Sequence, residues 1–534
     1  MLHWHGLKVS GMKPSSVQKM ALRAFGGLAR RAGAPLGSFE TMENLSGEGY
    51  PALTVRPKRG TVANLTAFGG GIAVKDALLY VDGTALYCNG IKTNLVLSEG
   101  DKQLISMGAY LLIWPDKCYL NTADLSDCGT IERTFTTAGS VTLRPVAAED
   151  DEEGQLSYTA VEAAGIGREF AAGEGVYIAG GGALLPEGTY SLIGCDENSI
   201  VIPLATGEST TLDAPLTVRR YVPEMDFVCE CGNRLWGCKY GLVNGEVVNA
   251  VYGSALGDFR SWNSFRGLAS DSYAAARGSD GAFTAAYPYL GSVLFFKEHT
   301  VERLYIAANG AHQIVTLECD GVAKGSHRSL AMCEGVLYYH GLGGVYAFDG
   351  SLPRCISDDL GTLQGSGGAA GVLESTYYLA LTEGQQRHLL TLETRKGLWH
   401  RQDDLPVRQF ARRGNELFAL TDRAVIALHG TVGAQEAAAV RWMAQTTPIG
   451  VEQEGERYLS RLELRFDAAE KSQVTVAVSY DDGGSWQHCG TVTGRGVLGS
   501  VTVPVRAVRA PFLKLRLSGV GPCTVYGLHA VYEK

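Results

Sequence analysis

The stretch Gly335-Val-Leu-Tyr-Tyr-His-Gly-Leu-Gly-Gly-Val-Tyr-Ala-Phe348 contains two short apolar runs, each with an aromatic residue, on either side of a glycine-rich turn. Two such runs joined by turn residues predict a β-hairpin. The same pattern recurs in six other segments: Ala77–Tyr87, Tyr110–Leu120, Asn233–Tyr240, Ser292–Tyr305, Ser375–Leu381 and Asn415–Leu428. Hairpins therefore recur through most of the chain, and the fold class predicted is all-β.

The spacing of the later hairpins indicates a repeat. The corresponding residues Leu294, Leu337, Tyr378 and Leu417 are separated by 43, 41 and 39 residues. A hairpin repeat with a period of about 40 to 50 residues is typical of β-propeller blades. The sequence therefore predicts a discontinuous β-propeller of about six to seven blades over residues 61–128 and 222–435.

The remaining parts of the chain depart from this repeat. The hairpins at Leu112 and Leu235 lie 123 residues apart, and the short strands predicted between them indicate a small inserted β-barrel at 129–221. After about residue 436, alternating runs such as Leu462–Phe466 and Val474–Tyr480 predict an antiparallel β-sandwich that extends to residue 534. Residues 1–60 are expected to form an extended N-terminal arm.

The composition fits a large, turn-rich β protein. The chain has 534 residues, of which 68 are Gly, and its formal net charge is −9. This length exceeds what one hydrophobic core supports, so several domains or one large repeat architecture are expected. The acidic balance argues against a broad nucleic-acid-binding surface.

The sequence contains no signal for export and no pattern for a metal. No apolar run has the length of a membrane span, and the N-terminus lacks the regions of a signal peptide, so a cytosolic product without a membrane segment is expected. The 12 cysteines are then expected to be reduced core thiols. The cluster Cys229, Cys231 and Cys238 lacks the paired spacing of a zinc site, and neither a metal nor a cofactor is predicted.

One local motif predicts a specific turn. Ser479-Tyr-Asp481-Asp-Gly483-Gly-Ser485-Trp486 matches the Asp-box pattern S-x-D-x-G-x-[ST]-W of sialidases and other propellers. In this turn the aspartate accepts hydrogen bonds from turn amides, the glycine supplies an unusual backbone angle and the tryptophan covers the turn. We interpret the motif as structural.

Motifs for catalysis are missing. The sequence has no G-x-S-x-G, no H-E-x-x-H and no P-loop, and the N-terminal Phe/Tyr-Arg-Ile-Pro motif of a sialidase is also missing. The adjacent carboxylate pairs are better explained as turns than as acid and base. The sequence therefore predicts no catalytic residues, and it predicts that the chain is not an enzyme.

A set of short segments in the arm, the propeller and the C-terminal domain carries a further signal: Phe25–Leu28, Phe39–Ser46, Tyr50–Gly60, Gly232–Gly237, Val251–Trp262, Pro288–Val301, Ser479–Trp486 and Leu517–Gly527. Together these segments resemble a bacteriophage virion family, the packaged-DNA stabilisation or tail hub (nozzle) proteins of short-tailed phages.

The resemblance implies a structural role in the virion. It implies a homo-oligomeric ring, commonly a hexamer, beneath the portal and its adaptor ring and beside other tail proteins, assembled in the host cytoplasm. The ring would extend the DNA channel and retain the packaged genome without sequence-specific binding. An acidic chain suits such a channel, because like charges leave few lasting phosphate contacts.

Two segments are candidate assembly contacts. The basic residues Arg56, Lys58 and Arg59 are candidates for contact with a neighbouring subunit or with DNA, and a solvated turn is the alternative. Phe259 and Trp262 lie in a long connection typical of partner contacts, and packing across the propeller face is the alternative.

Three hypotheses for function follow. The first is a structural virion protein of the phage neck or tail. The second is a glycan-binding or receptor-binding propeller of the tail, and the third is a sialidase-like hydrolase.

Overall fold

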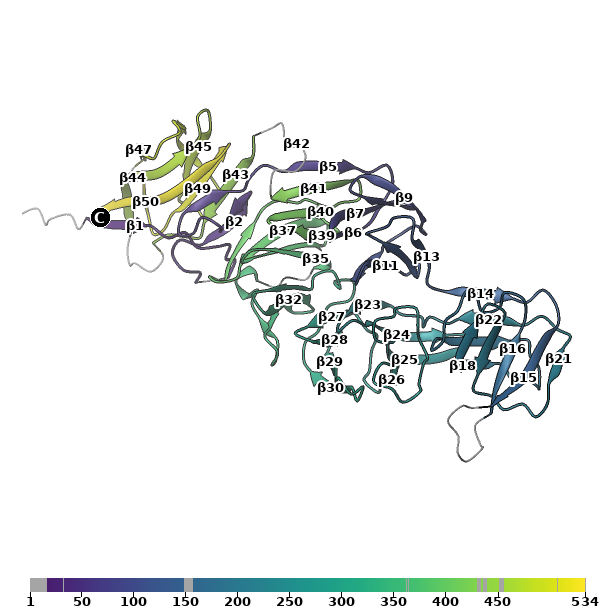
Figure 1. The fold of residues 1–534 in the computed structure, drawn as a ribbon. Helices are drawn as coiled ribbons and strands as arrows, with labels where there is room; N and C mark the ends of the chain where they lie inside the picture. The colour runs from purple at the N-terminus through teal and green to yellow at the C-terminus, as the bar shows by residue number, and fades with distance from the viewer. Residues whose placement is uncertain are drawn as a thin grey trace, which may run out of the picture.

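The computed structural model describes residues 17–31, 33–147, 157–361, 363, 365–429, 434–435, 439–450, 456–506 and 508–533. Within these ranges nearly all regular structure is β-strand, and the one helical element is the short 3₁₀ turn η1 (Asp358–Leu360). A propeller lies in the middle of an elongated molecule, with a C-terminal sandwich at one end and an inserted β domain at the other (Figure 1). This arrangement confirms the predicted fold class.

The propeller consists of seven antiparallel sheets, six of them built from four successive strands. The first two sheets are β6 (Gly69–Lys75), β7 (Ala77–Asp82), β8 (Ala85–Cys88) and β9 (Ile91–Val96), then β10 (Gln103–Met107), β11 (Tyr110–Trp114), β12 (Cys118–Asn121) and β13 (Cys128–Thr130). The third and fourth are β23 (Phe227–Glu230), β24 (Leu235–Val243), β25 (Glu246–Gly253) and β26 (Tyr273–Ala276), then β27 (Ala285–Tyr289), β28 (Ser292–Phe296), β29 (Thr300–Tyr305) and β30 (Gln313–Glu318).

The last three sheets complete the ring. They are β31 (Ala331–Cys333), β32 (Val336–Gly341), β33 (Gly344–Phe348) and β34 (Arg354–Cys355), then β35 (Ser366–Leu373), β36 (Thr376–Glu383), β37 (Gln386–Glu393) and β38 (Leu398–Arg401), and finally β39 (Gln409–Arg413), β40 (Glu416–Leu420) and β41 (Ala424–His429) with two further strands. The first strand of the last sheet, β39, contacts the first strand of the first sheet, β6, so the ring of sheets closes.

In each repeated hairpin, the first apolar run forms the second strand of a sheet. Residues Leu79, Leu112, Leu235, Leu294, Leu337, Tyr378 and Leu417 lie on these second strands, and all are at most 2% exposed. A second strand has partners on both edges and a neighbouring sheet on each face, so it needs an almost continuous apolar run. The apolar clusters between neighbouring sheets supply the core, as Leu294 with Leu337 does between the fourth and fifth.

The N-terminal part of the chain closes the last sheet. Strand β5 (Gly60–Asn64) pairs with β41 on one side and with β42 (Ala434–Gln435) on the other. The seventh sheet therefore combines residues that are more than 350 positions apart. This pairing joins the two ends of the propeller sequence.

A proline in β5 tests this closure. Thr61 pairs with Ile426 of β41 and with Ala434 of β42, so both edges of β5 are paired at this residue and its N–H points towards one of the two partner strands. We expect Thr61→Pro to lower the free energy of unfolding by about 1–3 kcal/mol, because the strand loses a ladder hydrogen bond and leaves a carbonyl unpaired. Urea denaturation beside Thr61→Ser checks this; equal midpoints for the two variants would count against the closure.

The inserted domain joins the second and third sheets of the propeller. One of its sheets contains β14 (Arg133–Thr136), β22 (Thr217–Arg220), β17 (Gly175–Ala179) and β18 (Gly188–Ser191). The other contains β19 (Gly194–Asp196), β20 (Ser199–Ile202), β16 (Ser157–Glu162), β15 (Val141–Ala147) and β21 (Thr210–Leu212). One apolar cluster, which includes Val161, Ile178 and Val218, contains residues of both sheets and forms the core.

The C-terminal sandwich also contains two sheets. One includes β3 (Leu45–Ser46), β4 (Leu53–Val55), β50 (Cys523–Glu533), β44 (Arg457–Ala468) and β47 (Gly499–Val503), with β1 (Gln18–Leu22) beside β50 and β48 (Arg509–Ala510) beside β44. The other contains β2 (Phe39–Glu43), β43 (Arg441–Thr446), β49 (Lys514–Val520), β45 (Gln473–Ser479) and β46 (Gln487–Thr493).

The prediction of an extended N-terminal arm at 1–60 needs correction for the residues described, which begin at 17. Strands β1 to β4 belong to the sandwich, and β5 begins at Gly60. Leu22, Phe25 and Phe39 are buried in the core that the sandwich shares with part of the propeller. An arm with these apolar side chains gains more by burial than by remaining extended in solvent.

Candidate functional site

The basic segment with Arg56 and Arg59 connects the sandwich to the propeller, and both arginines bind side chains of the same chain. Arg59 Nη1 lies 2.5 Å from Asp403 Oδ2, and Arg59 Nη2 donates to Gln402 Oε1 at 3.1 Å. Arg56 Nε donates to Asn44 Oδ1 at 2.7 Å, and its Nη2 lies 3.5 Å from the same Asp403 oxygen.

These contacts correct the assembly role predicted for Arg56 and Arg59, while the role predicted for Lys58 stays a prediction. Arg56 and Arg59 are 9% and 5% exposed, while Lys58 is half-buried. Two guanidinium groups that share a carboxylate inside the molecule cannot reach a neighbouring subunit or DNA. Arg56 and Arg59 instead fix the crossing from the sandwich to β5.

Phe259 and Trp262 are also buried, with 4% and 1% exposure. The Phe259 ring lies 5.1 Å from the ring of Tyr110, and Trp262 Nε1 donates to the Phe259 carbonyl at 2.9 Å. The same loop contacts the inserted domain, where Ser261 Oγ donates to the carbonyl of Gly173 at 3.3 Å. The partner contact predicted for both residues is therefore corrected: their side chains are buried between the second and third sheets of the propeller, and the main chain of their loop contacts the inserted domain.

The Asp-box motif forms the turn between β45 and β46. Asp481 Oδ1 accepts from the Ser485 N–H at 2.9 Å and from Ser479 Oγ at 2.7 Å, and Asp481 Oδ2 accepts from Ser485 Oγ at 2.7 Å. Gly483 has φ +93°, and its N–H donates to Ser479 Oγ at 2.9 Å. The guanidinium of Arg516 stacks on the Trp486 ring. Hydrogen bonds within the motif therefore fix the turn, and the stacked Trp486 and Arg516 side chains cover it.

The turn makes stability depend on pH. Hydrogen bonds from Ser485, and then from Ser479, lower the pKa of Asp481 to about 2. Because this pKa lies below the ordinary value near 3.9, the stabilisation is complete above about pH 4 and is lost as the pH falls towards about 2. We expect Asp481→Asn to lack this part of the pH dependence.

Urea midpoints measured at about pH 6 and about pH 2.5 check the prediction. The parent protein is expected to lose more stability than Asp481→Asn between these two conditions. An equal loss in both proteins would contradict the role of the carboxylate.

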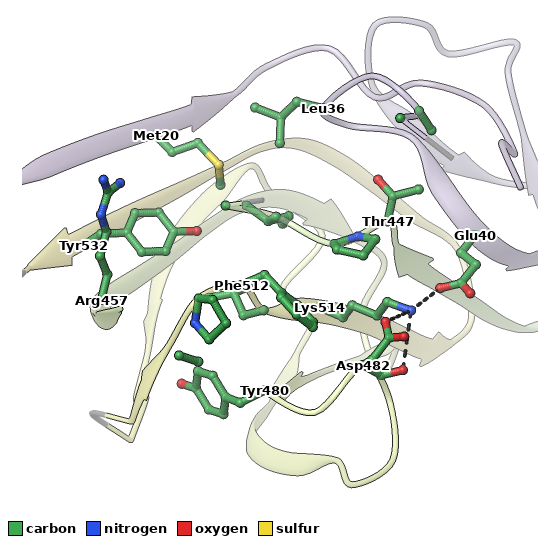
Figure 2. Close-up of a pocket in the computed structure, with 18 of the residues that line it drawn as sticks. Met20, Leu36, Glu40, Thr447, Arg457, Tyr480, Asp482, Phe512, Lys514 and Tyr532 are labelled. Carbon is green, nitrogen blue, oxygen red and sulfur yellow. Dashed lines mark hydrogen bonds and ion pairs between the residues drawn. The ribbon is translucent and has the colours of Figure 1, made fainter. Parts of the chain in front are cut away.

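A cavity of about 560 Å³ lies within the sandwich, between its N-terminal segment and strands from the C-terminal part of the chain (Figure 2). Met20, Leu36 and Phe512 supply apolar walls, and the Tyr532 hydroxyl points into the space without a hydrogen-bond partner among the described residues. The cavity therefore combines walls from opposite ends of the sequence.

A buried lysine lies at one end of this cavity. Lys514 Nζ lies 2.6 Å from Glu40 Oε2 and 2.6 Å from Asp482 Oδ1, and its side chain is 4% exposed (Figure 2). Burial opposes the charge, but hydrogen bonds with Asp482 and Glu40 outweigh it and raise the pKa of Lys514. The lysine thus ties β2 to the Asp-box turn, and its charge is already neutralised.

The second cavity, about 260 Å³, lies at one end of the propeller axis. Asp101, Arg328 and Arg408 each precede the first strand of a sheet, namely β10, β31 and β39. The first strands surround the axis and start at the same end, so these three side chains converge. We call Asp101, Arg328, Arg387, Arg408 and Asp422 the axial site.

Asp101 joins two arginines in this site. Its Oδ1 lies 2.6 Å from Arg408 Nη2 and 3.2 Å from Arg328 Nη1. Burial alone would raise the pKa of Asp101, but Arg328 and Arg408 outweigh it and hold the pKa below the ordinary value. Arg328 Nη2 also donates to the Lys102 carbonyl at 3.3 Å, so the cluster links the fifth sheet to the second.

Asp422 and His327 complete the surroundings. Asp422 Oδ1 lies 3.1 Å from Arg408 Nη1, and the Arg408 guanidinium stacks 4.2 Å above the centre of the Phe68 ring. Burial lowers the pKa of His327 to about 4, so this ring is neutral at pH 7. The axial site thus offers charged donors and charged acceptors in one small space.

The axial residues were missed in the sequence because they share no motif. Asp101, Arg328 and Arg408 come from separate connections between sheets, and more than 200 positions separate Asp101 from Arg328. A usable signal exists once the blades are assigned: a charged residue one to three positions before the first strand of a sheet.

The described residues contain no group of three or more His, Cys, Asp or Glu side chains arranged to hold a metal ion. Cys229, Cys231 and Cys238 lie in the apolar core between the third and fourth sheets. Burial raises the pKa of Cys231 to about 11, so its thiol stays protonated at pH 7. Among all the residues that the structure describes, no helix has the length and apolar character needed to span a bilayer.

No protein-family model and no curated protein matches the chain. Among solved structures, an exo-β-1,3-galactanase from Phanerochaete chrysosporium matches 57% of this chain and 95% of its own, at 9% identity and a TM-score of 0.23. A bifunctional GH43-CE protein of Bacteroides eggerthii matches 57% and 62%, at 9% identity and 0.21. Oligopeptidase B from Leishmania major matches 73% and 53%, at 10% identity and 0.24.

These similar structures include glycoside hydrolases, and they contradict the prediction that the chain is not an enzyme. That prediction is wrong, because it relied on the absence of short catalytic motifs from the sequence. In a propeller the side chains around the axis come from different sheets, so a site need not appear as a motif in the sequence. At these identities and TM-scores the likeness transfers no reaction to this chain.

Proposed function

We propose that this protein is a ring-forming structural subunit in the neck or tail of a short-tailed bacteriophage, a tail hub or nozzle protein. The proposal begins from the sequence resemblance to that family. In the virion the ring would lie below the portal and adaptor rings, extend the DNA channel and help to retain the packaged genome.

The observation that carries the proposal is the position of the resembling segments. Tyr50–Gly60 contains the crossing from sandwich to propeller, and Val251–Trp262 contains the joint with the inserted domain. Ser479–Trp486 forms the Asp-box turn. Two of these segments connect neighbouring domains and the third lies in the sandwich. Their positions therefore support a resemblance that extends over the whole architecture.

A fourth resembling segment has a similar structural role. In Gly232–Gly237, the buried side chain of Arg234 donates to the carbonyls of Ser254, Asp271 and Ala269 at 2.6–2.7 Å. One arginine thereby fixes the start of β24 to the long loop before β26. Joints fixed in this way suit a subunit that transmits mechanical load through a ring.

Electron microscopy of the full chain, alone and mixed with the portal and adaptor proteins of the same phage, tests the proposal. We expect closed rings, or binding of the chain to the end of the portal–adaptor complex. A chain that stays monomeric at high concentration and does not join the complex would refute the structural role. The portal protein mixed with an unrelated propeller is the control.

A further inference from the structure

The axial site contains more cationic groups than its own carboxylates neutralise. It has three guanidinium groups and two carboxylates, and among the described residues these carboxylates form ion pairs only with Arg328 and Arg408. Arg387, at the start of β37, is exposed and forms no ion pair or side-chain hydrogen bond among the described residues. The site therefore has one positive charge available for an anion.

One donor inside the site also lacks a partner. Arg408 Nε is buried and has no hydrogen-bond partner within the part of the chain that the structure describes. A buried N–H without an acceptor is costly, and a bound acceptor relieves that cost. Arg387 and Arg408 therefore both favour an anionic ligand, and a guanidinium pairs well with a carboxylate.

The two carboxylates restrict the kind of anion. Their side chains are 52% and 51% exposed for Asp101 and Asp422, so each retains lone pairs that face the cavity or solvent. Carboxylate oxygens accept hydrogen bonds from hydroxyl groups but repel a second negative charge. This combination favours a ligand with one negative charge and several hydroxyl groups.

The remaining walls and the volume of the cavity also fit a ligand with one negative charge and several hydroxyl groups. Ala380, Leu405 and Pro406 supply an apolar side to the cavity. Its volume, about 260 Å³, lies just below the range of about 300–1,000 Å³ typical of drug-sized ligands. The C–H face of one sugar ring fits such a wall, while its hydroxyl groups reach the carboxylates.

We propose that the axial site binds a sugar acid, as one residue of an acidic glycan. The ligand carboxylate pairs with Arg387 and accepts from Arg408 Nε, and ring hydroxyl groups donate to Asp101 and Asp422. This proposal does not depend on the role in a phage ring, because binding is measured on the isolated chain whatever its oligomeric state.

Calorimetric titration of the full chain tests this site. The probes are glucuronate, galacturonate and N-acetylneuraminate, with glucose and galactose as neutral counterparts and with acetate and phosphate as simple anions. We expect a sugar acid to bind at least about 10-fold more tightly than its neutral counterpart, since a charge-assisted pair adds about 1.5–3 kcal/mol. Equal binding of the neutral sugar, or equally tight binding of acetate or phosphate, would overturn the proposal.

A matched pair of variants locates the binding. Arg387→Gln is expected to weaken sugar-acid binding by about 10- to 100-fold. Arg354→Gln, at an exposed arginine on the outer strand β34, is expected to leave it unchanged. Both positions are exposed, so the urea midpoints should match the parent. Unchanged affinity in folded Arg387→Gln would overturn the assignment to the axial site.

Discussion

Replacing Asp403 by asparagine is expected to lower the free energy of unfolding by about 3–5 kcal/mol. The Asp403 carboxylate is shared by Arg56 and Arg59, whose side chains are 8% and 5% exposed. Asparagine preserves the shape but removes the charge, so two buried cations lose their common counter-ion. Removing one partner of a buried ion pair costs more than the pair itself contributes, because the remaining charge stays desolvated.

The next residue provides the control. Asp404 is exposed and forms no ion pair with any residue that the structure describes, so Asp404→Asn is expected to change stability by less than about 0.5 kcal/mol. Urea denaturation followed by tryptophan fluorescence reports the difference between the two variants. Similar midpoints for both would show that the crossing at Arg56 and Arg59 does not need the carboxylate.

Trp262→Ala is expected to cost about 3–5 kcal/mol, the range for removing a fully buried tryptophan. Trp262 is 1% exposed and lies in the cluster that includes Trp114 and Phe259. The main chain of the inserted domain packs closely here, since a Cβ on Gly175 would lie 2.1 Å from the Trp262 carbonyl oxygen. Loss of the indole should therefore also loosen the joint between the propeller and the inserted domain.

Limited proteolysis combined with thermal denaturation measures both effects. We expect Trp262→Ala to be cleaved between the propeller and the inserted domain faster than the parent. Phe265, on the same loop but 57% exposed, supplies the control, and Phe265→Ala should behave like the parent. If the two alanine variants are cleaved at the same rate, Trp262 does not hold the joint.

The propeller was predictable because its signal is local. Each second strand is buried on both faces, so segments such as Ser292–Phe296 are almost wholly apolar, and the last four recur at nearly constant spacing. The Asp-box turn was predictable for the same reason, since Asp481, Gly483 and Ser485 interact within one short turn. Burial of a strand and hydrogen bonding within a turn both depend on residues that are close together in the sequence. Both therefore leave a recognisable sequence pattern.

The N-terminal segment was misjudged because its partners are far away in the sequence. The amide of Asn44 donates to the carbonyl of Arg441, a separation of 397 positions, and β1 pairs with β50 near the end of the chain. Short strands next to glycine and proline look like an arm when no partner is visible. The basic residues Arg56 and Arg59 looked solvated because Asp403 was not visible as their partner.

By itself the sequence determined an all-β chain, its repeated hairpins, the position of the insertion and the Asp-box turn. Each of these depends on contacts between residues that are near one another in the chain. Only the tertiary structure decided that the N-terminal segment completes the sandwich and the last propeller sheet, that Phe259 and Trp262 are buried, and that Asp101 meets Arg328 and Arg408 from two other sheets. Closing a ring of seven sheets brings distant connections together, and the free energy of those contacts comes from partners that no local pattern specifies.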